Sequence, residues 1–253
     1  MNLMGLWTLF GKEVRRFWKV VGQTVASPVI TALLYLLVFR QVMADRVEVY
    51  PGVAYTAFLV PGLIMMSVIQ NAFANAASSL TQSKINGNLV FILLPPLSPL
   101  EIYLAFTGAA ILRALLVGTV LYTAGWLFVP LPLAQPAVVL AAVLLSAGCL
   151  AVIGLIAGIL ADKFEHMAAF QNYLIMPLSF LSGVFYSVHD LPPFWAEFSH
   201  YNPFFYMIDS LRHGFFGQSD AALWLSLPVV GLFFVLLSAA ALTMLTRGVK
   251  LRP

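Results

Sequence analysis

The stretch AVVLAAVLLSAGCLAVIGLIAGIL, residues 137–160, contains no charged side chain. A transmembrane helix needs about 20 consecutive apolar residues to cross the roughly 30 Å hydrocarbon core of a bilayer. The stretch is long enough, so it predicts a helix that crosses a membrane. Its small residues recur on one helical face and predict close packing against another helix: Ala147, Ala151, Gly154, Gly158 and Ala161.

Five further segments have a similar length and apolar character, at about 24–42, 55–79, 101–128, 168–189 and 222–246. Together with 137–160 they predict six transmembrane helices in a single transmembrane domain, residues 1–253. Several of these segments contain proline, which a membrane helix tolerates because neighbouring helices can satisfy the freed carbonyl groups.

The composition supports this fold class, an all-α integral membrane protein. Of the 253 residues, 61% are hydrophobic and 9% are charged, whereas an ordinary soluble domain has about 25% charged residues. The mean hydropathy is +0.94. This composition argues against a soluble enzyme, a disordered chain and a nucleic-acid binder, and the single cysteine, Cys149, excludes a disulfide framework.

The basic residues predict the orientation, because cytoplasmic loops of membrane proteins are enriched in lysine and arginine. Six spans place both termini on one side, together with Lys12, Arg15, Arg16, Lys19, Lys84, Lys163, Arg247, Lys250 and Arg252. The other side holds only Arg40, Arg46 and Arg212. We therefore expect both termini in the cytoplasm. Val42-Met43-Ala44 weakly resembles a signal-peptide cleavage site, but the apolar run before it is long for a signal.

Residues 1–22 predict an amphipathic helix before the first span. Apolar residues at positions 3, 6, 10, 14, 17 and 21 share one face, and the opposite face carries Lys12, Arg15, Arg16 and Lys19. Such a helix lies in the membrane interface, with its basic face toward anionic lipid headgroups. Two interpretations stay open: an orientation anchor alone, or an anchor that also packs against a cytosolic partner.

Polar residues form a stripe on the second span. They recur every three or four positions, with Gln70 to one side: Ser67, Asn71, Asn75, Ser78 and Gln82. A polar face inside the membrane could line a transport pathway. It could equally connect helices, because amide side chains form hydrogen bonds across membrane interfaces.

Arg113 is the only charged residue well inside a predicted span. It lies about 18 Å along the helix from Glu101, at 1.5 Å per residue. An arginine near the middle of a bilayer costs ~3 kcal/mol or more unless it is shielded, so Arg113 should face a polar interior. The candidate pathway residues are therefore Ser67, Gln70, Asn71, Asn75 and Arg113.

The motifs for nucleotide and metal binding are missing from this sequence. Gly11-Lys12 is the only Gly-Lys pair, and Glu13 follows it where a Walker A motif requires Ser or Thr. The four histidines lack the spacing of a metal site. We therefore predict no catalytic, cofactor-binding or metal-binding residues. Arginine does not release its proton at physiological pH, so Arg113 argues against a proton-coupled carrier.

Two connections are too elaborate to be simple loops. The segment 80–100 is cytoplasmic, and its short apolar run is predicted to form a helix that ends at Pro95-Pro96. The segment 187–221 is external and dense in aromatic residues, which favours short re-entrant or interfacial helices before the last span. Within it, Asp209 and Arg212 are three residues apart and are predicted to pair on one helical face.

Several short stretches of the sequence resemble one known family. LSGVFY (181–186), LPPFW (191–195) and YNPFFYMIDSLR (201–212), followed by Gly217, are similar to the outer region of type-2 ABC-transporter permeases. VPGLIMM (60–66) resembles the start of that family's second span. The segment from Lys84 to Pro95 falls where the family places its coupling helix.

The resemblance implies the permease subunit of an ATP-driven exporter in a bacterial inner membrane. It implies six spans, an N-terminal interfacial helix, external re-entrant helices and a dimer with a second copy of the chain. Separate ABC ATPase subunits would bind ATP and Mg²⁺, so this chain would hold no cofactor and would not itself be an enzyme. Members of the family export drugs, lipids, glycolipids or oligosaccharides, and the choice among these stays open, as does homodimer against heterodimer.

The resemblance also assigns a coupling site. Coupling to the ATPase would use Lys84, Ile85, Asn86, Gly87 and Asn88. The external segment 187–221 has two interpretations: an aromatic belt at the outer interface, or an outer gate. The candidate outer-gate residues are Asn202, Pro203, Asp209 and Arg212. Many members carry acidic residues in the coupling helix, whereas residues 85–94 contain none.

Two other functions remain as alternatives. The first is a membrane enzyme that acts on lipid-linked substrates and uses the outer residues His189, His200 and His213 together with nearby acids. The second and weaker one is a proton-coupled carrier.

Overall fold

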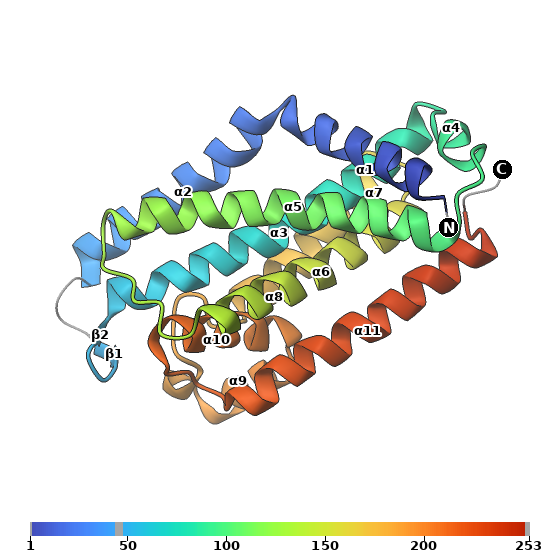
Figure 1. Ribbon diagram of the computed structural model, residues 1–253. Helices are drawn as coiled ribbons and strands as arrows, with labels where there is room; N and C mark the ends of the chain where they lie inside the picture. The colour runs from blue at the N-terminus through green and yellow to red at the C-terminus, as the bar shows by residue number, and fades with distance from the viewer. Residues whose placement is uncertain (1, 44–47, 251–253) are drawn as a thin grey trace.

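The computed structural model describes residues 2–43 and 48–250. Ala44, Arg46 and Arg252, on which parts of the sequence argument rest, lie outside the described residues. The elements follow in chain order (Figure 1): α1 (Leu3–Trp18), α2 (Val21–Met43), β1 (Glu48–Tyr50), β2 (Val53–Ala54), α3 (Tyr55–Ile85), α4 (Leu89–Leu93), α5 (Pro99–Trp126), α6 (Pro136–Leu160), α7 (Phe164–Phe170), η1 (Gln171–Ile175), α8 (Met176–Phe180), η2 (Val188–Asp190), α9 (Pro193–His200), α10 (Pro203–Phe216) and α11 (Leu223–Arg247).

Within the described part of the chain, five helices are long and apolar enough to cross a membrane: α2, α3, α5, α6 and α11. They run lengthwise through the molecule (Figure 1). The two strands form only a small antiparallel hairpin between α2 and α3. The predicted all-helical membrane fold is confirmed at this level, and five of the six predicted spans match these helices.

The segment predicted as the fifth span, 168–189, is built differently. A helix runs over residues 164–180 as α7, the π-helical turn η1 and α8, and Pro177 is the second residue of α8. This is shorter than the about 20 residues that a crossing needs. Beyond Phe180 the chain turns at Gly183, whose φ of 75° favours glycine. The sixth crossing and the re-entrant character of α9 and α10 stay predictions.

Helix α3 lies at the centre of the fold, and most of its side chains are buried. Helix α6 packs closely against it through the two glycines of the predicted small-residue stripe. A Cβ atom on Gly154 would collide with the carbonyl oxygen of Phe73, and one on Gly158 would lie 2.9 Å from Cβ of Leu80. The backbones can meet only because these side chains are absent.

The two elaborate connections contain short helices, as predicted. Helix α3 continues to Ile85, so the first residues of segment 80–100 belong to it. Helix α4 follows, and α5 begins with a capping box in which Ser98 and Glu101 bond reciprocally to each other's backbone. The external segment contains η2, α9 and α10.

The position of the N-terminal helix in the membrane interface stays a prediction, and the structure adds one contact that the sequence did not predict. The buried residues of α1 are Leu9, Glu13 and Phe17, whereas Leu3 is exposed. The helix is rotated so that one acidic residue faces the protein, where polar groups of α3 receive it. Apolar periodicity alone could not show this, because it depends on the polar stripe of another helix.

Candidate functional site

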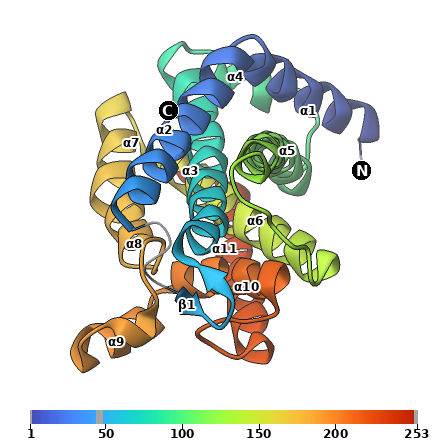
Figure 2. The ribbon, with the colours of Figure 1, turned by 90° about the vertical axis from the view of Figure 1, so that its left-hand side faces the viewer.

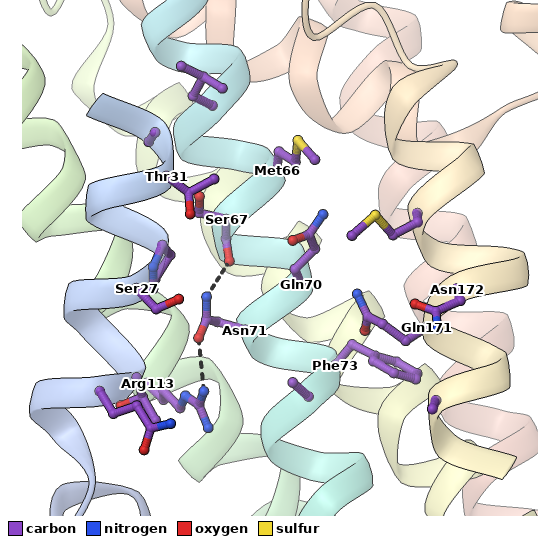
Figure 3. A pocket seen from close by; sticks show the side chains of 18 of the residues that line it. Ser27, Thr31, Met66, Ser67, Gln70, Asn71, Phe73, Arg113, Gln171 and Asn172 are labelled. Carbon is purple, nitrogen blue, oxygen red and sulfur yellow. Dashed lines mark hydrogen bonds between the residues drawn. The ribbon is translucent and has the colours of Figure 1, made fainter. Parts of the chain in front are cut away.

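A polar cavity of about 760 Å³ lies between α2, α3, α5 and the helix α7–η1–α8. Helices α2 and α7–α8 lie on one side of α3, and α5 and α6 lie on the other (Figure 2). Ser27 and Thr31 on α2 and Gln171 on η1 point into the space from opposite sides (Figure 3). This space is the candidate functional site, and we call it the polar cavity.

Four of the five predicted pathway residues line the polar cavity: Ser67, Gln70, Asn71 and Arg113. The amide nitrogen of Asn71 donates to the carbonyl oxygen of Ser67 at 3.0 Å, and its oxygen accepts from the guanidinium of Arg113 at 3.0 Å (Figure 3). Asn75, the fifth, is buried behind the cavity and accepts from Arg113 at 3.4 Å. These five residues therefore come together, but their contact with a substrate stays a prediction.

Sequence reasoning missed the two outer walls of the polar cavity. Helix α2 contributes Gln23, Thr24, Ser27 and Thr31, and η1 contributes Gln171 and Asn172. The polar residues of α2 recur at steps of three and four, which is typical of one helical face. This pattern was overlooked because Pro28 interrupts it and the rest of the span is apolar. The π turn that presents Gln171 could not be read from the pattern, and such turns often occur at functional sites.

A buried polar network continues from the polar cavity to α1. The guanidinium of Arg16 donates to the side-chain oxygen of Asn75 at 2.9 Å and to its carbonyl oxygen at 2.8 Å. The carboxylate of Glu13 accepts from Arg16 at 3.3 Å, from Lys12 at 2.8 Å and from the hydroxyl of Ser79. Glu13 is fully buried. This network fixes α1 to α3.

Replacement of Glu13 by glutamine should lower the free energy of unfolding by about 1–3 kcal/mol, because Arg16 and Lys12 lose a charged acceptor in a buried site. Thermal unfolding of the purified protein in detergent measures the effect. The exposed Glu197 provides the control, since Glu197→Gln should stay within about 0.5 kcal/mol of the parent. Equal unfolding midpoints for the two variants would contradict a stabilising role for Glu13.

Aromatic rings cluster next to Tyr35, which lines the polar cavity. The ring of Phe185, in the turn after α8, lies 5.4 Å from Tyr35, 5.6 Å from Phe39 and 5.8 Å from Phe180 between centroids. The hydroxyl of Tyr55 donates to the carbonyl oxygen of Phe185 at 2.8 Å and holds the turn against α3. This aromatic cluster joins α2, α3 and the turn after α8 beside the polar cavity.

The predicted outer-gate residues hold backbone segments together. Asn202 accepts from the backbone N–H of Phe204 at 3.0 Å as the N-cap of α10, and it donates to the carbonyl of Leu178 at 2.8 Å. Pro203 is the first residue of α10. Asp209 accepts from the backbone N–H groups of Asp220 and Ala221. None of the four lines the polar cavity.

The predicted pairing of Asp209 with Arg212 was wrong. No ion pair within 4.0 Å joins them in the described structure. Arg212 instead donates to the carbonyl oxygens of Gly183 and Val184 at 2.7 and 3.0 Å, and its guanidinium lies 3.6 Å from the ring centre of Phe58. Asp209 prefers backbone donors at the start of α11, which spacing along α10 could not reveal.

Arg212 and Gly62 explain two of the motifs that carry the family resemblance. A Cβ atom on Gly62 would lie 2.8 Å from the carbonyl oxygen of Val184 and 3.3 Å from Arg212. The glycine of the 60–66 motif therefore lets the turn 183–184 approach α3, and the arginine of the 201–212 motif binds that turn. Both residues thus position the segment that carries Phe185.

The predicted coupling residues have two different environments. Lys84 donates to the carbonyl oxygens of Ile159 and Ala161 at 2.9 and 2.7 Å and to Asp162 at 3.2 Å, and its side chain is only 12% exposed. The other four are exposed at the turn between α3 and α4: Ile85, Asn86, Gly87 and Asn88. The ammonium of Lys84 therefore satisfies the carboxyl end of α6.

Asp162 completes this cluster at the end of α6. Its carboxylate accepts from Lys250 at 2.7 Å as well as from Lys84. Hydrogen bonds from Lys250 and Lys84 hold the pKa of Asp162 below its usual value. The cluster ties the end of α11 to α3 and α6 at the same end of the molecule as α4.

The outer histidines form no shared site. His200 packs edge-on against Phe205, and His213 bonds to the hydroxyl of Ser219 at 3.0 Å. Across residues 2–43 and 48–250, no three His, Cys, Asp or Glu side chains lie close enough to hold a metal ion. The structure therefore adds no observation in favour of the enzyme alternative.

A bundle of apolar helices around a polar cavity defines a helical membrane protein with a polar interior. The family model of ABC-2 type transporters matches residues 4–216. The chain belongs to the ABC-2 type transporter family, and the resemblance inferred from its motifs is confirmed.

Curated relatives support the same family. The chain is 36% identical to the inner membrane transport permease YadH of Escherichia coli (strain K12) over 249 residues, which cover 98% of this chain and 97% of YadH. It is 27% identical to the capsule polysaccharide export inner-membrane protein CtrC of Neisseria meningitidis serogroup B, with 76% of this chain and 70% of CtrC covered. It is 26% identical to nodulation protein J of Rhizobium leguminosarum bv. viciae, with 77% and 74% covered.

Proposed function

We propose that this chain is the permease subunit of an ATP-driven exporter in a bacterial inner membrane. The observation that carries the proposal is the polar cavity, which lies among helices apolar enough to cross a membrane in a chain of the ABC-2 type transporter family. Six crossings, with α7–η1–α8 as the fifth, would place both termini in the cytoplasm. The first residues of α1 and the last of α11 lie at the same end as α4 (Figure 1), which supports this arrangement.

The proposed pathway is formed by two copies of the chain, with separate ATPase subunits that bind ATP and Mg²⁺. Helix α2 supports a dimer, because it flanks the polar cavity and exposes a row of apolar side chains: Ile30, Leu34, Leu37 and Val38. One copy encloses its polar cavity incompletely. A second copy would cover its open side and keep substrate out of contact with lipid.

The ATPase is proposed to dock on α4 and the turn before it. Val90, Phe91 and Leu94 expose 57, 72 and 71% of their surface at this end. A groove of about 540 Å³ separates α4 from α1 and has both apolar and polar lining, including Phe91, Ile92 and Lys12. An apolar anchor beside a recess is the surface that a protein partner recognises. Contact through Lys84 is disfavoured because its ammonium is already bound.

Replacement of Phe91 by glutamate should reduce co-purification of the ATPase at least tenfold, because a carboxylate would have to be desolvated at the centre of the contact. The measurement is the amount of ATPase retained on the affinity-tagged permease. Phe164, a half-exposed aromatic residue at the same end, provides the control, and Phe164→Glu should retain the ATPase. Equal retention by both variants would contradict docking on α4.

Reconstitution with the partner ATPase into liposomes tests the proposed function itself. We expect compounds that are exported to stimulate ATP hydrolysis, and transport to stop without ATP. Transport that persists without ATP and follows a proton gradient would refute the proposal.

A further inference from the structure

The charge in the lining of the polar cavity is positive and has no negative partner there. Among the described residues that line the polar cavity, Arg113 is the only charged one, and none has a carboxylate. The described structure contains no ion pair to Arg113, which bonds to the neutral amide oxygens of Asn71 and Asn75. Its Nε atom is buried without a hydrogen-bond partner in the described structure. The positive charge is oriented but not neutralised.

The surroundings of Arg113 increase this excess of positive charge. Arg16 donates to the same Asn75 oxygen that accepts from Arg113. The nearby carboxylate of Glu13 lies on the far side of Arg16 and is bound by Arg16, Lys12 and Ser79. An arginine at membrane depth is costly when it is unshielded. An anion in the polar cavity would recover part of that cost.

The rest of the lining combines polar and apolar side chains. Amides and hydroxyls reach it from α2, α3 and η1: Gln23, Thr24, Ser27, Thr31, Gln70, Gln171 and Asn172. The same lining holds apolar side chains, among them Leu63, Met66, Phe73 and Met176. Methionine side chains adapt to apolar groups of varied shape. A molecule that carries both an anionic group and an apolar part matches this lining.

We propose that the polar cavity binds amphiphiles that carry a phosphate or carboxylate group, with that group paired to Arg113. This inference rests on the proposed function, because it names the class of molecule that the pathway takes. Asn71 and Asn75 act as positioning residues, since each accepts one hydrogen bond from a terminal nitrogen of the guanidinium and leaves the second N–H of that nitrogen for the ligand. The volume of about 760 Å³ lies within the usual range of small-molecule sites.

Equilibrium binding of radiolabelled dodecyl phosphate to the purified full-length chain in dodecyl maltoside tests the inference. We expect saturable binding that is at least tenfold weaker in Arg113→Gln. Arg113→Lys should bind with intermediate affinity, because lysine keeps the charge but loses the fork of donors. Arg40→Gln removes an equal charge from an exposed position outside the polar cavity and should bind as the parent does.

Three competitors identify the chemistry of the ligand. Dodecanoate should displace the label, whereas dodecyltrimethylammonium should not. Inorganic phosphate should compete only at far higher concentration. Phosphatidylglycerol in nanodiscs distinguishes a membrane lipid headgroup from an exported molecule. If it displaces the labelled dodecyl phosphate, the site belongs to resident lipid. If it does not, the site belongs to a transported amphiphile. Both sources share the anionic chemistry and support the site.

Several results would overturn the inference. These are equal binding by Arg113→Gln and the parent, equal displacement by the cationic amphiphile, or inorganic phosphate as effective as dodecyl phosphate. Monodisperse elution and an unchanged unfolding midpoint would show that Arg113→Gln is folded. If that variant does not fold, the affinity of Arg113→Lys decides whether binding depends on Arg113. The assay needs no ATP and no ATPase, so it can fail while ATP-driven export succeeds, and the reverse.

Discussion

Arg212→Met should destabilise the protein by about 3–5 kcal/mol, because two buried carbonyl oxygens would each lose a hydrogen bond to a charged donor, worth about 1.5–3 kcal/mol. Arg212 is 1% exposed, and its guanidinium satisfies the carbonyl oxygens of Gly183 and Val184 while it stacks on Phe58. Methionine fills the space but leaves two buried carbonyl oxygens without their donor.

Thermal unfolding in detergent and the yield of monodisperse protein measure this loss. Arg212→Lys retains the charge and should lose about half as much stability, because an ammonium does not stack on an aromatic face as a planar guanidinium does. Arg40→Met removes an exposed arginine and should change little. An Arg212→Met protein with the parent's unfolding midpoint would show that the turn 183–184 does not depend on this residue.

Gly154→Ala and Gly231→Ala should change stability in opposite directions. A methyl group on Gly154 would meet the Phe73 carbonyl and lie 3.1 Å from Cβ of Ala76, so α3 and α6 must separate. Overpacking of this kind costs about 1–3 kcal/mol. Gly231 in α11 has no atom within 4 Å of the added Cβ, so alanine should stabilise the helix there by about 0.5–1 kcal/mol.

The pair of glycine variants is an internal comparison, since the chemical change is identical and both sites lie inside long helices. Unfolding midpoints in the same detergent give the difference. Stabilisation of both variants would mean that helix propensity, and not the contact between α3 and α6, determines the effect. Gly154→Ala should also lower the yield of folded protein in the membrane.

Long apolar runs made five helices predictable, because burial in lipid requires length and hydrophobicity and little else. The segment 168–189 was harder to predict. Its π turn and the turn at Gly183 depend on Pro177 and on the arginine contact from α10. Such long-range contacts leave no periodic signal in the sequence.

The candidate site was predictable where one helix carries the signal. The stripe on α3 and the isolated charge of Arg113 identified one wall of the polar cavity. The opposite wall needs the approach of α2 and η1 to α3, which is a tertiary contact. Glu13 was missed for a similar reason: its burial is explained only by the polar partners on α3.

The uneven packing of the helices determines which of them can move at a small cost in free energy. Helix α3 is buried along most of its length and joined to α6 through glycine contacts, so these two would shift as one body. Of the α2 residues whose burial is described, only Ala32 and Leu36 are buried. A displacement of α2 therefore breaks few contacts within the chain. The width of the polar cavity can change in this way, at small energetic cost, while α3 and α6 stay in place.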